Sequence, residues 1–476
     1  MQEKRYNYNS LLNSQRVGAG ARGSSKNIEA FYSDRTRILY CSAFRRLQQK
    51  AQVFSMETDS SVRSRLTHSL EVSDLGRKLA NEIAYKLSRK GWLTSTNIPV
   101  VVAIVENACL LHDIGNPPFG HFGESAIQDW ARHKAAGAVP EGMEYDELLE
   151  GLMADFAEFD GNPQGFRTVT KLFTEFDRHG LDLTCATLLC GLKYARTTGE
   201  PRGKGIMKKA GFFQTEQALV TELLRRTGVE VHRRYPLTYI MEAADDIAYC
   251  MSDIADGIEK RILTEEEFVR TFARIWDEKC PGMAYPREIK TFLQDPEKMH
   301  GFNRDFSIPW STRATQEAVQ AYMDRHAEVF EGTADALISD EKPMGRVLKI
   351  IRCVCGQLLY PSIEAESIEL TGYAVITGIL RHYERLLRLD HEAFAGLVSG
   401  EGRDLAVERR LYNRIGTRCV DAYKFAVAEL DPAAPGYAAR EWWLRVHLLM
   451  DHISSMTDAY ALETYQMLEG IALMRT

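Results

Sequence analysis

One short segment of the chain, residues 109–124 (CLLHDIGNPPFGHFGE), concentrates side chains that can bind a metal or move a proton. His112 and Asp113 are adjacent, and His121 and Glu124 follow within the same sixteen positions. Imidazole and carboxylate groups are the usual donors for divalent cations and for general acid–base chemistry. The apolar approach to His112 indicates a partly buried segment, and packing alone does not account for so many titratable groups there.

A long amphipathic helix predicted over residues 62–87 carries a further histidine, His68, between Leu66 and Leu70. A lone histidine in such a place is more often a core residue than a ligand. Its relation to residues 109–124 therefore decides its role.

A third helix, predicted over residues 236–261, carries aspartates on an otherwise apolar surface. At 100° per residue, Asp245, Tyr249 and Asp253 fall within about 80° of one another and share a face. Asp246 points about 100° away and is expected to cap or pair. Buried carboxylates are costly unless they are paired or bind a cation, so this face is a second candidate for metal or ligand contact.

If His68, His112, Asp113 and one aspartate of the third helix converge, they offer two imidazoles and two carboxylates. Such a set suits Mn²⁺, Mg²⁺, Fe²⁺, Co²⁺, Ni²⁺ or Zn²⁺, and it does not choose among them. A divalent ion can polarise an oxygen or lower the pKa of a bound water, as hydrolysis of a phosphoester or anhydride requires. The residues thus favour a metal-dependent hydrolase.

The elements that must position these groups are helices. Helical periodicity runs through most of the 476 residues and strand alternation is nearly absent, so the fold is predicted to be all-α. We expect a mobile N-terminal arm over residues 1–30, a catalytic core over 31–280 and a C-terminal helical region over 281–476. The irregular stretch 281–313 is the candidate boundary, and residues 184–195 are expected to form a buried helix.

Composition limits the classes of partner. The formal net charge of −7 argues against wholesale binding to nucleic acid or to a membrane surface. The nine scattered cysteines are typical of a reduced, cytosolic protein. No apolar run reaches the roughly 18 residues of a membrane span, so we expect a soluble, cytoplasmic enzyme.

The pattern H…HD…D resembles the HD-domain superfamily of phosphohydrolases. The segments RSRLTHSLE, ACLLHDIGNPPFGHFGE, LKYAR, MKKAGFF and PLTYIMEAADDIAY are similar to the deoxyguanosine triphosphate triphosphohydrolase (dGTPase) family, over roughly residues 30–260. The resemblance implies an HD-domain helical core and hydrolysis of dGTP to deoxyguanosine and triphosphate by attack at the α-phosphorus.

The resemblance also implies roles for individual residues. It implies metal ligation by His68, His112, Asp113 and Asp245, catalysis by His121 and Glu124, and substrate binding by Gln52, Val53, Arg65, Lys193, Tyr194, Lys209, Tyr249 and Asp253. Asp245 is preferred to Asp246 because Tyr249 and Asp253 follow it at the family's spacing for contacts to deoxyribose. Lys193 and Lys209 would contact the triphosphate, although the loop around residues 195–213 also fits an ordinary exposed basic loop. His121 would be a general acid/base or a nucleophile.

For cofactors, the resemblance implies Mg²⁺ or Mn²⁺ first, with Co²⁺, Ni²⁺, Fe²⁺ or Zn²⁺ as further candidates. For partners, it implies dGTP or another dNTP, a homo-oligomer with a hexamer favoured, and single-stranded DNA as an effector. The helix at 439–468, with Trp442 and Trp443, could bury an oligomer interface or simply pack in the core.

Three alternatives remain at this point. A broad-specificity dNTP triphosphohydrolase uses the same residues. An HD phosphodiesterase or nucleotidase explains the metal residues but leaves Lys193, Lys209 and the Tyr249 face without a role. A non-hydrolytic protein that senses nucleotide or single-stranded DNA is the third.

Overall fold

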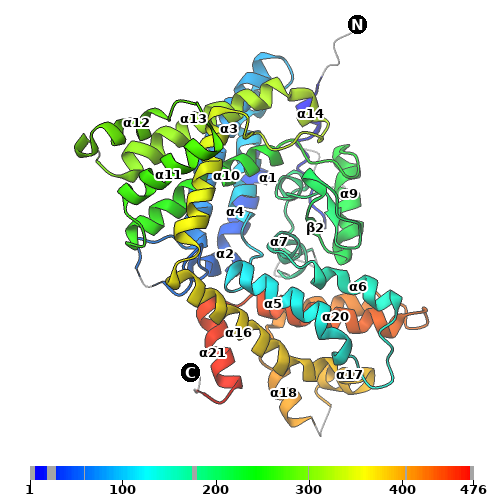
Figure 1. Ribbon diagram of the computed structural model, residues 1–476. Coiled ribbons are helices and arrows are strands. Elements are labelled where there is room, and N and C mark those ends of the chain that lie inside the picture. Colours follow the sequence, from blue (N-terminus) through cyan, green and yellow to red (C-terminus); the bar gives the residue numbers. More distant parts are fainter. Residues whose placement is uncertain are drawn as a thin grey trace.

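The computed structural model describes residues 6–18, 28–57, 59–173, 179–298, 300–401 and 405–471. Its described residues form an all-α protein, as predicted (Figure 1). Within them, the only named strands are β1 (Arg196–Thr197) and β2 (Ala210–Phe212), a short parallel pair in the lysine-rich loop. None of the described helices is long and apolar enough to cross a membrane.

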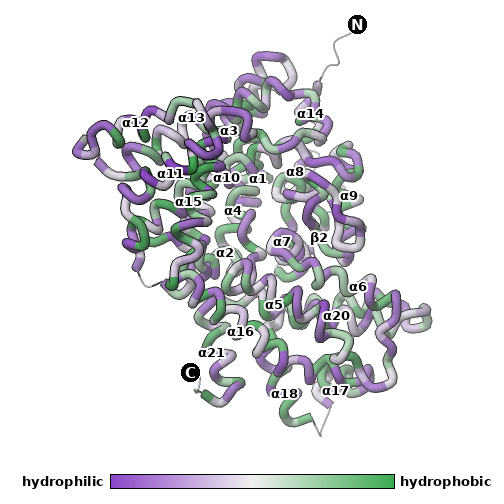
Figure 2. The backbone as a smooth tube through the Cα atoms, in the orientation of Figure 1, coloured by the Kyte–Doolittle hydropathy of each residue, from purple (hydrophilic) through white to green (hydrophobic). Residues whose placement is uncertain are grey.

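The first of three hydrophobic clusters surrounds α4 (Ile98–Leu111), whose side chains are almost all buried. It packs against α3 (Arg65–Arg89), α1 (Ile28–Tyr40), α10 (Thr238–Glu259) and α8 (Cys185–Cys190), and Figure 2 shows the apolar middle of this group. A helix without a wide polar face must be surrounded by other helices, so α4 becomes the axis of this cluster. Other members are α2 (Ser42–Arg46), α7 (Gly161–Lys171), α9 (Gln217–Thr227) and α14 (His326–Phe330).

The second cluster joins the site to the C-terminal half of the chain. Its helices are α5 (Gly120–His133), α6 (Glu147–Ala157), α16 (Ile363–Leu387), α17 (His391–Ser399), α18 (Ala406–Tyr412), α19 (Thr417–Ala428), α20 (Tyr437–Ser454) and α21 (Asp458–Leu468). Trp442 and Trp443 are buried inside it, at 0% and 7% exposure. Of the two readings of these tryptophans, core packing is therefore the one the structure supports.

The third cluster covers the other side of α10. It contains α11 (Glu265–Lys279), α12 (Arg287–Gln294), α13 (Ile308–Asp324) and α15 (Pro343–Val354). Short 3-10 helices lie at Tyr8–Ser10, Leu47–Gln49, Ser95–Asn97, Ala135–Ala138, Gly205–Met207, Gln214–Glu216 and Pro296–Lys298, and π-helical turns at Asn303–Ser307 and Cys355–Leu359. Because α10 contributes to the first and third clusters, the Asp245 helix is held from two sides.

Several details differ from the sequence-based expectations. The helix expected over residues 184–195 ends at Cys190, because the chain turns at Gly191 toward the strand pair. Residues 281–313 are not simply irregular, since α12 lies within them. Part of the expected N-terminal arm, residues 1–5 and 19–27, lies outside the described residues.

Residues 6–18, by contrast, are packed into the protein. Tyr8 is fully buried, its backbone N–H donates to Trp92 O, and the Tyr235 hydroxyl donates to Leu11 O. Buried apolar surface and satisfied backbone groups fix this segment, so the mobile-arm expectation does not describe it.

Gly115, in the turn after α4, allows α7 to approach closely. A Cβ atom built on Gly115 would lie 2.0 Å from Gly165 N and 2.2 Å from Gly161 O, both backbone atoms that cannot swing away. The turn between α4 and α5, which begins with His112 and Asp113, is called the HD turn. The absence of a side chain at Gly115 therefore sets the distance between the HD turn and α7.

We predict that Gly115→Ala lowers the free energy of unfolding by about 3 kcal/mol, because the added methyl group forces two backbones apart. Thermal or urea denaturation measures it. Gly151→Ala is the matched control, since Gly151 lies in helix α6 with nothing within 4 Å of a built Cβ. The control should be neutral or slightly stabilising; equal stability of Gly115→Ala and wild type would contradict the close-approach argument.

Candidate metal centre and active site

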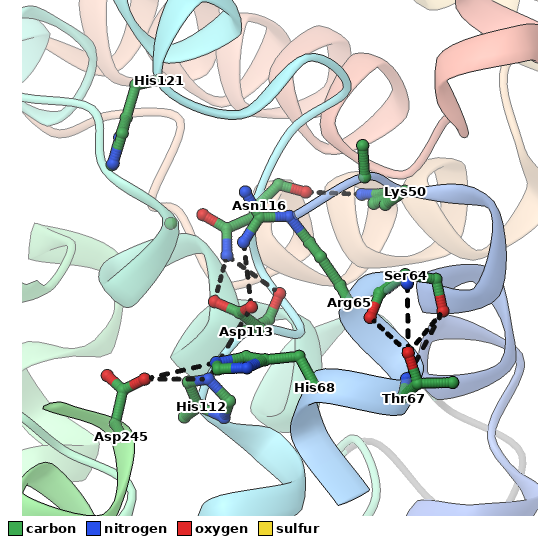
Figure 3. Close-up of polar contacts among 12 residues, drawn as sticks. Lys50, Ser64, Arg65, Thr67, His68, His112, Asp113, Asn116, His121 and Asp245 are labelled. Atoms are coloured by element: carbon green, nitrogen blue, oxygen red, sulfur yellow. Dashed lines mark hydrogen bonds and ion pairs between the residues drawn. The ribbon is translucent and has the colours of Figure 1, made fainter. Parts of the chain in front are cut away.

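His68, His112 and Asp245 form a cluster of side chains that face one another (Figure 3). One ligand atom from each lies within 4.8 Å of the other two. Asp245 Oδ1 is 3.6 Å from His68 Nε2 and 3.5 Å from His112 Nε2. The first turn of α3, the residue after α4 and the middle of α10 supply these side chains, so the mutual packing of three helices creates the cluster.

Three of the four ring nitrogens of the cluster are buried without hydrogen-bond partners among the described residues. Among the described residues, neither nitrogen of His68 nor Nε2 of His112 has one. His112 Nδ1 lies 2.7 Å from Cys109 O, which favours a proton on Nδ1 and a lone pair on Nε2. Unpaired buried polar atoms are costly unless a ligand satisfies them. Two imidazoles and a carboxylate facing one another therefore fit a divalent metal ion.

Asp245 is charged in this setting. Burial acts to raise its pKa, but Lys193 and the two imidazoles outweigh burial and hold the pKa of Asp245 well below its usual range. The neighbouring Asp246 also lines the cavity but is not part of the cluster, and burial raises its pKa to about 6. The geometry thus places Asp245, and not Asp246, beside the two histidines, as the family spacing implies.

Asp113 lies beside the cluster and is already engaged. Its Oδ2 is 2.9 Å from Arg65 Nη1 and 3.7 Å from His112 Nε2, and its Oδ1 accepts a 2.6 Å hydrogen bond from Asn116 Nδ2. Although Asp113 is buried, Arg65 holds its pKa at about 2. Metal ligation by Asp113 stays a prediction, and Arg65 is placed to orient this carboxylate.

His121 and Glu124 form a second unit at the start of α5. His121 Nδ1 lies 2.8 Å from Glu124 Oε2, and Glu124 Oε1 accepts a 2.7 Å hydrogen bond from Gly161 N. The hydrogen bond and charge of Glu124 raise the pKa of His121. The His121 side chain is 82% exposed while that of Glu124 is 8% exposed, so a buried carboxylate orients an accessible imidazole. Figure 3 shows His121 apart from the cluster.

The turn that carries His121 is held from the C-terminal half. Phe119 has the left-handed φ of 60°, uncommon for a bulky residue, and its N–H donates to Asp458 Oδ1 at 3.0 Å. Asp458 Oδ2 also accepts from Ala51 N, at 3.1 Å. Asp458, buried at the start of α21, thereby ties the HD turn to the segment before Gln52. Sequence reasoning missed it, because its pattern signals only a helix start.

A cavity of about 470 Å³ joins the two units. Most of the residues with implied roles line it: Gln52, Val53, Arg65, His112, Asp113, His121, Glu124, Lys193, Tyr194, Lys209, Asp245 and Tyr249. His68 and Asp253 are fully buried behind this lining. Lining from α5, α10 and α16 shows that the cavity lies where the three clusters meet.

The implied phosphate-binding lysines are paired with acids of the cavity. Lys193 Nζ donates to Asp245 Oδ2 at 3.1 Å, and Lys209 Nζ donates to Asp160 Oδ2 at 2.5 Å. Asp160 is the N-cap residue of α7, and Lys209 belongs to the lysine-rich loop. Because Lys209 lines the cavity, the alternative of an ordinary exposed basic loop does not describe this segment. Lys208 is exposed and does not line the cavity.

The implied sugar-binding face contains a residue that sequence reasoning missed. The Tyr360 hydroxyl donates to Asp253 Oδ2 at 2.7 Å and lies 2.5 Å from the Tyr249 hydroxyl. Burial raises the pKa of Asp253 to about 7, and its Oδ1 has no partner among the described residues. Ile368 and Glu369 also line the cavity. No spacing rule links these C-terminal residues to α10.

Two histidines and an aspartate from α3, the end of α4 and α10, with a His–Asp pair directly after the buried α4, are the pattern of an HD-domain protein, and the HD domain family model matches residues 65–154. Proteins named deoxyguanosinetriphosphate triphosphohydrolase are similar over almost the whole chain. Those of Cronobacter sakazakii (35% identity, 95% of this chain and 96% of the relative) and Serratia proteamaculans (36% identity, 93% and 94%) are two examples. The chain belongs to the deoxyguanosinetriphosphate triphosphohydrolase family.

The geometry of the cluster predicts that Asp245 and Asp246 differ in their importance for metal binding. Asp245→Asn should weaken Mn²⁺ binding at least about tenfold, because it removes the charged oxygen that both imidazoles face. Asp246→Asn is the matched control and should bind Mn²⁺ nearly as wild type does. Isothermal titration of metal-free protein measures both; loss of binding in Asp246→Asn alone would reverse the assignment.

Proposed function

We propose that this protein hydrolyses dGTP to deoxyguanosine and inorganic triphosphate by attack at the α-phosphorus. The observation that carries the proposal is one cavity containing the His68–His112–Asp245 cluster, the His121–Glu124 pair and two lysines. The names of the near-full-length relatives support dGTP as the substrate.

His68, His112, Asp113 and Asp245 are the proposed ligands of a divalent ion. When bound, such an ion supplies Lewis-acid polarisation of the phosphoryl oxygen and of water. Mg²⁺ and Mn²⁺ are proposed first because two of the four donors are carboxylates, and the two imidazoles leave Co²⁺, Ni²⁺, Fe²⁺ and Zn²⁺ open. Arg65 keeps the Asp113 carboxylate ionised and oriented.

His121 is the proposed proton-transfer or nucleophilic group, and Glu124 is its positioning residue. The accessible His121 imidazole can reach the reacting phosphate, whereas the buried Glu124 carboxylate fixes the ring through Nδ1 and leaves Nε2 for chemistry. Gly161 N–H holds the other Glu124 oxygen, so the pair is anchored to α7.

The triphosphate is proposed to meet Lys193, Tyr194, Lys209 and Arg65. Lys193 and Lys209 now neutralise Asp245 and Asp160, and phosphate oxygens compete for the same N–H donors. Local cations let a protein with net charge −7 bind a polyanion.

Deoxyribose is proposed to pack on Tyr249, with Asp253 accepting from the 3′-hydroxyl. The unpaired Asp253 Oδ1 supports this role, since a buried acceptor needs a donor. Gln52 and Val53 are proposed to contact the nucleoside. Glu369, contributed to the cavity by α16, can accept from the N1–H and 2-amino edge of guanine, as a guanine-selective site requires.

A cytoplasmic homo-oligomer, with a hexamer favoured and single-stranded DNA as effector, completes the proposal. All nine cysteines are free, as a reducing compartment allows. Ile363 and Leu370, two turns apart on α16, are 79% and 70% exposed, as residues of a subunit interface can be.

Product analysis tests the reaction. Metal-loaded protein incubated separately with each dNTP and with GTP should convert dGTP to deoxyguanosine and triphosphate and should leave GTP largely intact. Chromatography identifies the products. Equal turnover of all dNTPs would indicate a broad-specificity enzyme, and release of monophosphate or no hydrolysis at all would overturn the proposal.

Glu124→Gln should shift a limb of the pH–rate profile to lower pH. The Glu124 carboxylate raises the pKa of His121, so a neutral amide lowers it. If the unprotonated form of His121 is active, the acidic limb of the profile shifts to lower pH. If the protonated form is active, the alkaline limb shifts to lower pH.

His121→Ala, the companion variant, should bind dGTP but lose nearly all turnover. Unchanged limbs in Glu124→Gln, or wild-type turnover in His121→Ala, would contradict the pairing.

A further inference from the structure

Three cations of the active-site cavity are each held by one carboxylate. The three pairs, with the distance between the nearest nitrogen and oxygen atoms, are Lys193–Asp245 (3.1 Å), Arg65–Asp113 (2.9 Å) and Lys209–Asp160 (2.5 Å). All six side chains line the same cavity. A polyanion that enters the cavity must therefore compete with these carboxylates for the cations.

The third pair differs from the other two in its acid. The acids of the first two pairs are proposed metal ligands, so a divalent cation offsets their charge when it is bound. Asp160 lies outside the proposed ligand set, and within the described part of the chain its salt-bridge partner is Lys209 alone. Lys209 therefore stays neutralised when the other two cations become available to phosphate oxygens.

The two oxygens of the Asp160 carboxylate have separate tasks. Oδ1 accepts a 2.9 Å hydrogen bond from Asn162 N and so caps the N-terminus of α7. Oδ2 accepts from Lys209 Nζ. The cap holds Asp160 in place whether or not Lys209 is bound to it. An asparagine side chain keeps a capping oxygen and removes the charge, so substitution can separate the two tasks.

Lys209 is an accessible ammonium on a nearly buried carboxylate. The exposed fraction is 45% for the Lys209 side chain and 10% for that of Asp160. Burial acts to lower the pKa of Lys209, but the charge and hydrogen bond of Asp160 and the charge of Glu124 raise it above its usual range. The charged lysine can exchange its partner by rotating its own flexible chain, while the capped aspartate stays where it is.

We propose that Asp160 competes with triphosphate for Lys209 and thereby limits how tightly the active site retains the inorganic triphosphate product. This role rests on the proposed function, and it concerns a carboxylate that neither binds the metal nor reacts. When phosphate oxygens take Lys209, the Asp160 charge is left nearly buried without its cation, which is unfavourable. The pair therefore offsets part of the attraction between a highly charged product and the cavity.

Titration of metal-free protein with inorganic triphosphate measures this competition without any turnover, so its outcome is separate from that of the proposed reaction. Asp160→Asn should bind triphosphate at least about fivefold more tightly than wild type, because it frees Lys209 and keeps the helix cap. A purely structural role of Asp160 predicts the opposite sign, since a disturbed cavity binds its ligand more weakly.

Asp146→Asn is the matched control. Asp146 caps α6 as Asp160 caps α7, with its Oδ1 accepting from Leu149 N at 2.9 Å. It is exposed, and the lining of the cavity does not include it. The same substitution there removes one charge and keeps a cap, so triphosphate affinity should stay within about twofold of wild type.

Lys209→Met shows whether the effect passes through the lysine. In this background, Asp160→Asn should tighten triphosphate binding much less than it does when Lys209 is present, because no ammonium is left to release. In the metal-loaded enzyme, Asp160→Asn should also make inorganic triphosphate a stronger inhibitor of dGTP hydrolysis.

Thermal denaturation confirms that each variant is folded. Asp160→Ser, which also supplies a capping oxygen, replaces Asp160→Asn if the latter does not fold. Equal triphosphate affinity of the folded Asp160 variant and wild type, equal tightening with and without Lys209, or equal tightening in Asp146→Asn would overturn the proposal.

Discussion

The cost of keeping polar atoms buried without partners is the constraint on which the structure depends. Two imidazoles and the Asp245 carboxylate meet in the interior because α3, α4 and α10 pack there. Lys193 keeps Asp245 ionised despite burial, and the free ring nitrogens stay available for a cation. The packing of three helices therefore holds together two imidazoles and a carboxylate whose burial without partners is unfavourable by itself.

The HD turn lies between the histidine of the candidate metal cluster and the histidine that is paired with Glu124. Before the turn, His112 is fixed by a backbone carbonyl and faces the interior. After it, His121 lines the cavity and is fixed by Glu124. Gly115 lets α7 approach, and Asp458 secures the left-handed Phe119. Local backbone strain at such a turn persists because the surrounding structure holds it.

The C-terminal half is part of the catalytic site as well as a second core. Tyr360 bonds to the proposed sugar-binding residues, and Asp458 ties down two segments of the catalytic half.

The sequence by itself determined the all-α class, the principal helices and many of the residues that line the active-site cavity. Helical periodicity and local motifs carry this information, because α3, α4 and α10 each place their polar residue at a fixed point of an apolar face. Tertiary structure decided the rest. It ended α8 at Cys190, packed residues 6–18, buried Trp442 and bonded Asp113 to Arg65. Tyr360 and Asp458 lie far along the chain from the residues that they contact, Asp253 and Phe119. Contacts of that kind depend on how helices pack, which no short-range spacing encodes.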